Sequence, residues 1–209
     1  KSRGQDLSLT EIIETCVRRD IQAISPWRDQ VAAVGLNTVS KLVKTHGLKL
    51  SGYCRGGMFP ATTPAGIAAA DADNRQAVDE ACELNATCLV LVVGGLPGAL
   101  AGQALHKNIE LSRHQVFEGI EKLLAYAKSC NMPLAIEPLH PMYAADRACI
   151  NTLEQALDMC DALNTRIDQY DSTPEAKRLV LLAEMLEYAL AIHETAAVEA
   201  TKAQAKETA

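Results

Sequence analysis

Two side chains that can move protons, those of Glu137 and His140, follow a short apolar segment at residues 134–136. This segment has no alternating polar positions, a pattern typical of a strand buried on both faces of a parallel sheet. Pro138 and Pro141 cannot donate ladder hydrogen bonds, so they end the strand. Glu137 therefore falls at the carboxyl end of the strand and His140 just beyond it, where parallel α/β folds place their ligands.

The alternative for these two residues is structural. Glu137 can be satisfied by a local ion pair, and His140 can be an ordinary histidine of a surface loop. Other polar residues and glycines also follow predicted strands, and the carboxyl ends of parallel strands meet on one rim of the fold. This convergence favours a functional site over the structural alternative. The rim residues predicted in this way are Trp27, Arg28, Arg55, Gly94, Gly95, Glu137 and His140.

The order of predicted elements indicates an α/β fold. Ser8 and Glu11 have the spacing of a capping box and predict a first helix that starts at this point. Apolar segments at 21–25, 48–54, 87–93 and 134–136 predict four strands, with a polar loop at 27–29. Helices are expected at 34–45, 71–84, about 113–129 and, after Thr152 and Gln155, to about residue 163. Such alternation requires a parallel sheet with right-handed crossovers.

Composition narrows the class of function. The chain has 209 residues, 48% of them hydrophobic, which supports one sizeable core. The net charge of −6, without a Lys/Arg cluster, argues against nucleic-acid binding. No apolar run is long enough for a membrane span or a signal peptide, and the seven cysteines are scattered without a Cys-x-x-Cys pair. We therefore expect a reduced, cytoplasmic protein that binds a small molecule or another protein.

The chain divides into two predicted parts. Residues 1–163 form the α/β domain, and residues 164–209 form a helical tail. Ser172 and Pro174 are typical of a helix start. Because residues 179–192 are apolar nearly all round, this tail helix must be buried against another surface.

Several common catalytic and binding motifs are absent from the sequence. No Gly-rich phosphate-binding motif follows any of the predicted strands. His193 and Glu194 begin like a zinc-protease helix, but no histidine stands where the second ligand is required. Cys54, beside Arg55, has no assured base, so it is interpreted as a core thiol rather than a nucleophile.

Four segments together resemble the xylose-isomerase-like TIM-barrel superfamily, the sugar-phosphate isomerase/epimerase group. These segments are 24–28, 54–60, 91–97 and, most clearly, 134–143 with Asp146, Arg147 and 151–153. The resemblance runs from about residue 7 to 163 and implies a partial TIM barrel with about four recognisable strands. In this family four side chains hold a divalent cation on the carboxyl-terminal rim.

The resemblance also implies roles for individual residues. Glu137 matches the first metal ligand, whereas His140 matches a neighbour of this ligand rather than a ligand. Glu137 and His140 are the candidate catalytic residues. Trp27 and Arg55 match the lining of the substrate pocket. The implied metal is Mn, Mg, Co or Zn, and the implied substrate is a sugar or sugar phosphate.

Two main functions are compatible with these residues. The first is a metal-dependent sugar isomerase or epimerase that moves a proton next to a carbonyl. The second is a non-catalytic partial barrel that acts as an assembly module, with the tail helix mediating packing or a homo-oligomer. The second arises because an eight-stranded barrel needs about 250 residues, and the strands expected to carry the other three ligands are replaced by the tail. A sugar-binding module without metal is a third, weaker possibility.

Overall fold

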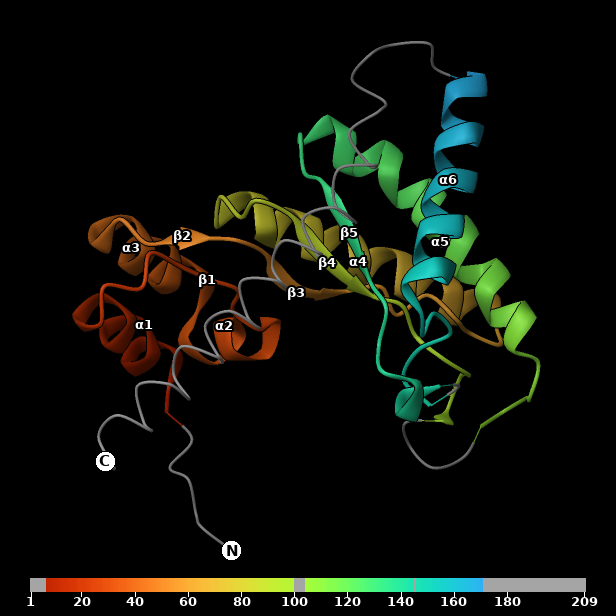
Figure 1. Cartoon of the computed structure of the whole chain (residues 1–209), viewed down its shortest axis with the longest axis horizontal. Helices are drawn as coiled ribbons and strands as arrows, with labels where there is room; N and C mark the ends of the chain where they lie inside the picture. Colours follow the sequence, from red (N-terminus) through yellow and green to blue (C-terminus); the bar gives the residue numbers. More distant parts are fainter. Residues whose placement is uncertain (1–6, 100–103, 145, 171–209) are drawn as a thin grey trace, which may run out of the picture.

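A computed structural model describes residues 7–99, 104–144 and 146–170 (Figure 1). The helices are α1 (Leu9–Arg18), α2 (Arg28–Val34), α3 (Leu36–His46), α4 (Pro64–Glu83), α5 (Ile109–Ser129) and α6 (Leu153–Tyr170). The strands are β1 (Ala23–Ile24), β2 (Lys49–Leu50), β3 (Tyr53–Gly56), β4 (Leu89–Val92) and β5 (Leu134–Glu137), and a short 3-10 helix, η2, spans Pro141–Tyr143.

The strands are parallel throughout the described part of the chain. β1 pairs with β2, and β3, β4 and β5 form a second sheet in that order. The strand expected at 48–54 is divided into β2 and β3, but it still lies between its expected neighbours. Cys54 N–H donates to the Pro26 carbonyl on one side (3.1 Å), and Tyr53 N–H donates to the Cys88 carbonyl on the other (2.9 Å). The partial TIM-barrel fold is thus confirmed, with no closed barrel among the described residues.

The two faces of the second sheet have different surroundings. Tyr53, Leu89, Leu91, Leu134 and Ile136 belong to the main hydrophobic core, together with residues of α4 and α5 (Figure 1). Side chains alternate between faces along a strand, so Ala135 and Glu137 point to the opposite face. Cys54 pairs in register with Val90, and Val90 with Ala135, which places Cys54 on the same face as Glu137.

Several element boundaries differ from the sequence-based predictions, for local reasons. The segment at 27–29, predicted as a loop, opens α2, and Gly35 separates α2 from α3 with φ of +96°. α4 begins at Pro64 instead of residue 71, because the Thr63 hydroxyl caps it by accepting from Gly66 N–H. α5 begins at Ile109 instead of about 113, capped by Asn108.

The first predicted capping box is confirmed and the second is confirmed in part. Ser8 accepts from Glu11 N–H, and the Glu11 carboxylate accepts from Ser8 N–H at 2.8 Å. Thr152 accepts from Gln155 N–H, but the Gln155 side chain accepts from Asn151 N–H instead of from Thr152. α6 continues to Tyr170, past the boundary predicted at 163. The predicted tail helix lies outside the described residues.

Two further features of the described chain concern its surface and its cysteines. No described helix is both long and apolar enough to cross a bilayer. All seven cysteines are free thiols, and Cys16, Cys54, Cys88 and Cys149 are buried.

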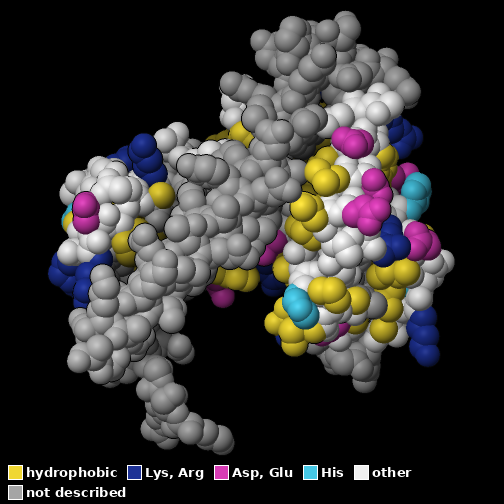
Figure 2. Space-filling view, viewed as in Figure 1, with side chains coloured by type: hydrophobic (Ala, Val, Ile, Leu, Met, Phe, Trp, Pro, Cys, Tyr) yellow, Lys and Arg dark blue, Asp and Glu magenta, His cyan; other side chains and the backbone are white. Residues whose placement is uncertain are grey.

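Hydrophobic side chains gather on the surface around η2 and α6, interspersed with acidic ones (Figure 2). Met142 is the most exposed of the large hydrophobic residues there, at 70%.

Candidate functional site

Glu137 ends β5, paired in register with Val92, and lies half-buried on the sheet face opposite α4 and α5. No hydrogen bond or ion pair joins it to another residue of the described chain. Burial without a compensating partner disfavours the charged form of a carboxyl group, and it raises the pKa of Glu137 above its usual value. A carboxyl group with a raised pKa can hold or accept a proton closer to neutral pH, which suits it to general acid–base chemistry.

Cys54 connects Glu137 with the other charged groups of the rim. Cys54 is 6% exposed, and burial, followed by the negative charge of Glu137, raises the pKa of its thiol to about 12. The charge of Arg55 acts in the opposite direction, and Asp29 adds to the increase. The thiol is therefore protonated at neutral pH, which confirms its interpretation as a core residue. Glu137, Arg55 and Asp29 all lie within electrostatic range of this one sulfur.

Trp27 and Arg55, the two predicted substrate-binding residues, line one cavity of about 460 Å³. Trp27 lies at the start of α2, and its backbone forms a parallel bridge with Cys54 of β3. Its side chain is 49% exposed. Arg55 is half-buried, with no hydrogen bond or ion pair to another described residue. The remaining lining residues are Arg28, Asp29, Ala32, Cys54, Gly56, Met58, Asp73, Gln76 and Glu80.

Neither Glu137 nor His140 is among the residues that line this cavity. His140 precedes η2, its side chain is exposed, and its Nδ1 accepts from Met142 N–H at 3.2 Å. Because Nδ1 is an acceptor in this bond, the neutral ring carries its proton on Nε2. The bond fixes the ring beside the chain that leaves β5. No hydrogen bond or ion pair joins His140 to Glu137 among the described residues.

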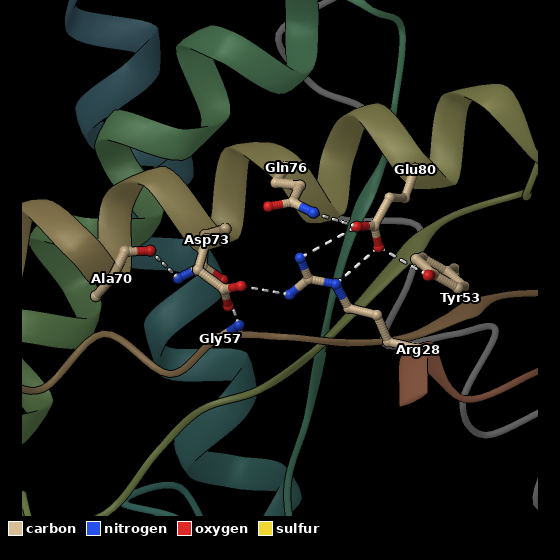
Figure 3. Close-up of polar contacts among 8 residues, drawn as sticks. Arg28, Tyr53, Gly57, Ala70, Asp73, Gln76 and Glu80 are labelled. Atoms are coloured by element: carbon tan, nitrogen blue, oxygen red, sulfur yellow. Dashed lines mark hydrogen bonds and ion pairs between the residues drawn. The ribbon is translucent and has the colours of Figure 1, made fainter. Parts of the chain in front are cut away.

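Arg28 was predicted as a residue of the rim, and its guanidinium binds two carboxylates of α4 (Figure 3). Its Nε lies 2.7 Å from Glu80 Oε2, its Nη2 lies 3.3 Å from Glu80 Oε1, and its Nη1 lies 2.8 Å from Asp73 Oδ1. The side chains of Arg28 and Glu80 are only 19% and 17% exposed, whereas that of Asp73 is 57% exposed. Arg28 therefore borders the cavity, but its charge is already neutralised.

The carboxylate of Glu80 is the centre of this network (Figure 3). Besides Arg28, it accepts from Tyr53 O–H at 2.8 Å and from Gln76 Nε2 at 2.8 Å, so each oxygen accepts two bonds. Burial alone would raise the pKa of Glu80, but the donors from Arg28, Tyr53 and Gln76 and the charge of Arg28 together lower it. Sequence reasoning missed the network. Its signal is the polar spacing of residues 73, 76 and 80, which lie on one face of a helix.

The loop that follows Arg55 is fixed by backbone contacts at Gly57. Gly57 N–H donates to the fully buried Asn74 side chain at 2.6 Å, and its carbonyl accepts from Gly94 N–H at 3.2 Å. Its φ is +105°, and a Cβ there would lie 2.8 Å from the Val92 carbonyl oxygen, so only glycine fits. The predicted rim residue Gly94 thus has a structural role, joining the exits of β3 and β4.

The described residues do not by themselves form a site for a divalent ion. No group of three or more His, Cys, Asp or Glu side chains within them is arranged to hold a metal. Glu137 offers one carboxylate, whereas Mg²⁺ and Mn²⁺ require several oxygen ligands in a fixed geometry. The donor set described here therefore does not fit the cation that the family resemblance implies.

With this geometry in place, the chain can be compared with known proteins. The sequence model of the xylose isomerase-like TIM barrel matches residues 11–168, so the chain belongs to that family. No match was found among curated proteins. The structural comparison identifies protein SMc04130 from Sinorhizobium meliloti 1021, with 55% identity and a TM-score of 0.71 over 76% of this chain and 55% of that one.

More distant structures share the fold. D-psicose 3-epimerase from Clostridium cellulolyticum H10, solved with D-tagatose, has 11% identity and a TM-score of 0.60. The IOLI protein, solved with a zinc atom, has 16% identity and the same TM-score. Each alignment covers 76% of this chain and 55% of the other. The chain thus spans about half the length of the structures that it matches.

Proposed function

We propose that this chain carries part of the active site of a sugar or sugar-phosphate isomerase or epimerase. The proposed chemistry is transfer of a proton on the carbon next to a carbonyl, with a Glu137 carboxylate oxygen as the accepting and donating atom. The observation that carries this proposal is the position of Glu137 at the end of β5, half-buried and without a hydrogen-bond partner among the described residues. The burial also raises its pKa. A base of raised pKa removes a carbon-bound proton more effectively than an ordinary carboxylate does.

Trp27 and Arg55 provide the proposed substrate contacts. An exposed indole next to a polar cavity suits the apolar face of a sugar ring, and the unpaired Arg55 guanidinium suits a phosphate or a hydroxyl group. His140 stays a candidate donor from Nε2 in the proposal, because its Nδ1 accepts from Met142 N–H, but it does not line the cavity that Trp27 and Arg55 share. D-psicose 3-epimerase, which shares the fold, was solved with a ketose, D-tagatose. The expected ligand class is therefore a ketose or its phosphate.

The proposal includes a divalent metal only if residues outside the described ranges supply its remaining ligands. Glu137 would be one of its ligands, and the bound ion would polarise the substrate oxygens. A similar fold holds a zinc atom in the IOLI protein. Plasma mass spectrometry of the purified chain tests this part, and metal-free protein with full activity would contradict it. A cytoplasmic location accords with the seven free cysteines.

The reaction is tested by hydrogen exchange. D-allulose, D-fructose or D-tagatose is incubated with the purified chain in D₂O, and deuterium at carbon 3 is followed by proton NMR. The proposal expects incorporation by the wild type and its loss in Glu137→Gln. The matched control is Glu83→Gln, which changes an exposed carboxylate at the end of α4 and should leave exchange unchanged. Equal exchange in the wild type and Glu137→Gln would contradict the proposal.

The second candidate is the non-catalytic assembly module. It is favoured by the lack of a three-ligand metal cluster among the described residues. Light scattering on the purified chain, run beside the exchange assay, separates the two candidates. A defined homo-oligomer without deuterium incorporation supports the module, and exchange lost in Glu137→Gln supports the enzyme.

A further inference from the structure

A polar network around Glu80 includes Arg28, the residue that follows a predicted substrate contact, Trp27. Arg28 follows Trp27 in the sequence and is the first residue of α2. Its guanidinium binds two carboxylates of α4, which lie 45 and 52 residues further along the chain. The start of α2 is therefore attached to α4 at the residue that follows the exposed indole.

Glu80 is a rigid attachment point, whereas Asp73 is not. Each Glu80 oxygen accepts two hydrogen bonds, and the two from Arg28 form a bidentate pair, which fixes direction as well as distance. Tyr53, one of the donors, is fully buried in the core. Asp73 makes one bond to Arg28 from a side chain that is 57% exposed, a setting in which ion pairs contribute little.

The Trp27 side chain has few other means of holding its orientation. The Trp27 backbone N–H donates to the Gln30 side chain at 3.2 Å, and its backbone forms a bridge with Cys54, but both contacts hold the main chain and not the indole. About half of the side chain is exposed, so packing restricts it only in part. The direction in which the indole leaves the chain thus depends on how firmly the first turn of α2 is held.

We infer that Glu80 is a positioning residue, which acts through Arg28 to hold the Trp27 indole at the cavity that Trp27 and Arg55 both line. Glu80 itself does not touch the ligand in this account, because both of its oxygens are saturated. The inference rests on the proposed function only where it assigns a sugar to Trp27. The orientation of the indole can be tested without any ligand.

Trp27 is the single tryptophan of the chain, so its fluorescence reports on this position alone. Time-resolved anisotropy and acrylamide quenching of the full chain are compared for the wild type, Glu80→Gln and the control Asp73→Asn, well below each unfolding temperature. We expect a larger fast anisotropy component and stronger quenching in Glu80→Gln, and wild-type values in Asp73→Asn. Unchanged Trp27 anisotropy in a folded Glu80→Gln would overturn the inference.

Gln76→Ala provides a milder variant in case Glu80→Gln does not fold. It removes one donor to Glu80, and alanine favours the helix, so the fold is retained. The same change in anisotropy is expected at smaller amplitude. Wild-type anisotropy in this variant, with Glu80→Gln unfolded, would overturn the inference, because Glu80 would then stabilise the fold without orienting the indole.

Titration with D-allulose, followed by quenching of Trp27, separates the inference from the proposed function. The expected dissociation constant rises about tenfold in Glu80→Gln and is unchanged in Glu83→Gln, at an exposed carboxylate of α4 that does not line this cavity. Without a response in the wild type, the proposed sugar contact fails, and anisotropy alone decides the positioning role. An equal dissociation constant in the wild type and a folded Glu80→Gln would contradict positioning even where the anisotropy differs.

Discussion

Two carboxylates of the same residue type, Glu80 and Glu137, have opposite environments. Glu80 accepts bonds from Arg28, Tyr53 and Gln76, and its pKa is lowered although it is partly buried. Glu137 is half-buried on the neighbouring sheet without a hydrogen-bond partner in the described chain, and its pKa is raised. The comparison shows how the surroundings of a carboxyl group separate a structural role from a chemical one. Hydrogen-bond donors stabilise the charged form of Glu80 and lower its pKa, whereas burial without donors raises the pKa of Glu137 and suits it to proton transfer.

The largest expected effect concerns activity at Glu137. Replacing Glu137 with glutamine removes the group proposed to move the proton, so the rate of deuterium incorporation should fall about 10²-fold or more. In Glu80→Gln, the proton-accepting group remains, and the loss should be confined to sugar binding. Initial rates over a range of sugar concentrations distinguish the two. A fall in the maximal rate that is as large in Glu80→Gln as in Glu137→Gln would contradict the assignment of a structural role to Glu80 and a chemical role to Glu137.

The next effect concerns stability at Glu80. Glu80→Gln leaves Arg28 with an incomplete partner at a site where both side chains are less than a fifth exposed, so we expect a loss of about 2–3 kcal/mol in the free energy of unfolding. Urea unfolding followed by circular dichroism measures it. Asp73→Asn, at an exposed carboxylate, should lose about 0.5 kcal/mol or less. Equal losses in the two variants would show that the bidentate pair is not the stronger attachment.

Glu137→Gln should have the opposite effect on stability. Burial of the ionised carboxyl group opposes folding at neutral pH, and the neutral amide removes this penalty, so the unfolding temperature at pH 7 should rise by a few degrees. Differential scanning calorimetry measures the change. A lower unfolding temperature would mean that Glu137 has a stabilising partner.

The two carboxylates should also give stability opposite dependences on pH. The folded pKa of Glu80 is below the usual 4.5, so its contribution is present above about pH 4.5 and lost as the pH falls through the folded value. The folded pKa of Glu137 is above 4.5, so its contribution is present below that pH and lost as the pH rises through the folded value. Unfolding temperatures from pH 3 to 7 should therefore show an acid loss that is reduced in Glu80→Gln. A profile in Glu80→Gln identical to that of the wild type would contradict this assignment.

Much of the fold could be predicted because its signals are local. The Ser8 capping box, the apolar strands and the alternation of elements depend on residues near one another in sequence, and they led to the parallel sheet. The start of α4 was missed although Thr63 and Pro64 form a helix start, because the small residues 65–70 lack a clear apolar period. The division of the strand at 48–54 could not be predicted, since it depends on pairing with two different neighbours.

The candidate site was predictable only in part. The strand end places Glu137, and the predicted rim contained both Trp27 and Arg55, which line the same cavity. The partners of Arg28 lie 45 and 52 residues away, so neither its saturation nor the role of Glu80 follows from local spacing. The hydrogen bond from Met142 N–H of η2 to His140 Nδ1 likewise could not be predicted from the strand pattern.

The most direct test of the central contrast is a titration of the glutamate side-chain carboxyl groups by carbon-13 NMR. Glu137 is assigned from the resonance that disappears in Glu137→Gln, and Glu80 from the one that disappears in Glu80→Gln. The account predicts a midpoint above 4.5 for Glu137 and below 4.5 for Glu80. A midpoint at or below 4.5 for Glu137 would contradict the account, because that carboxylate would then be stabilised in its charged form like Glu80.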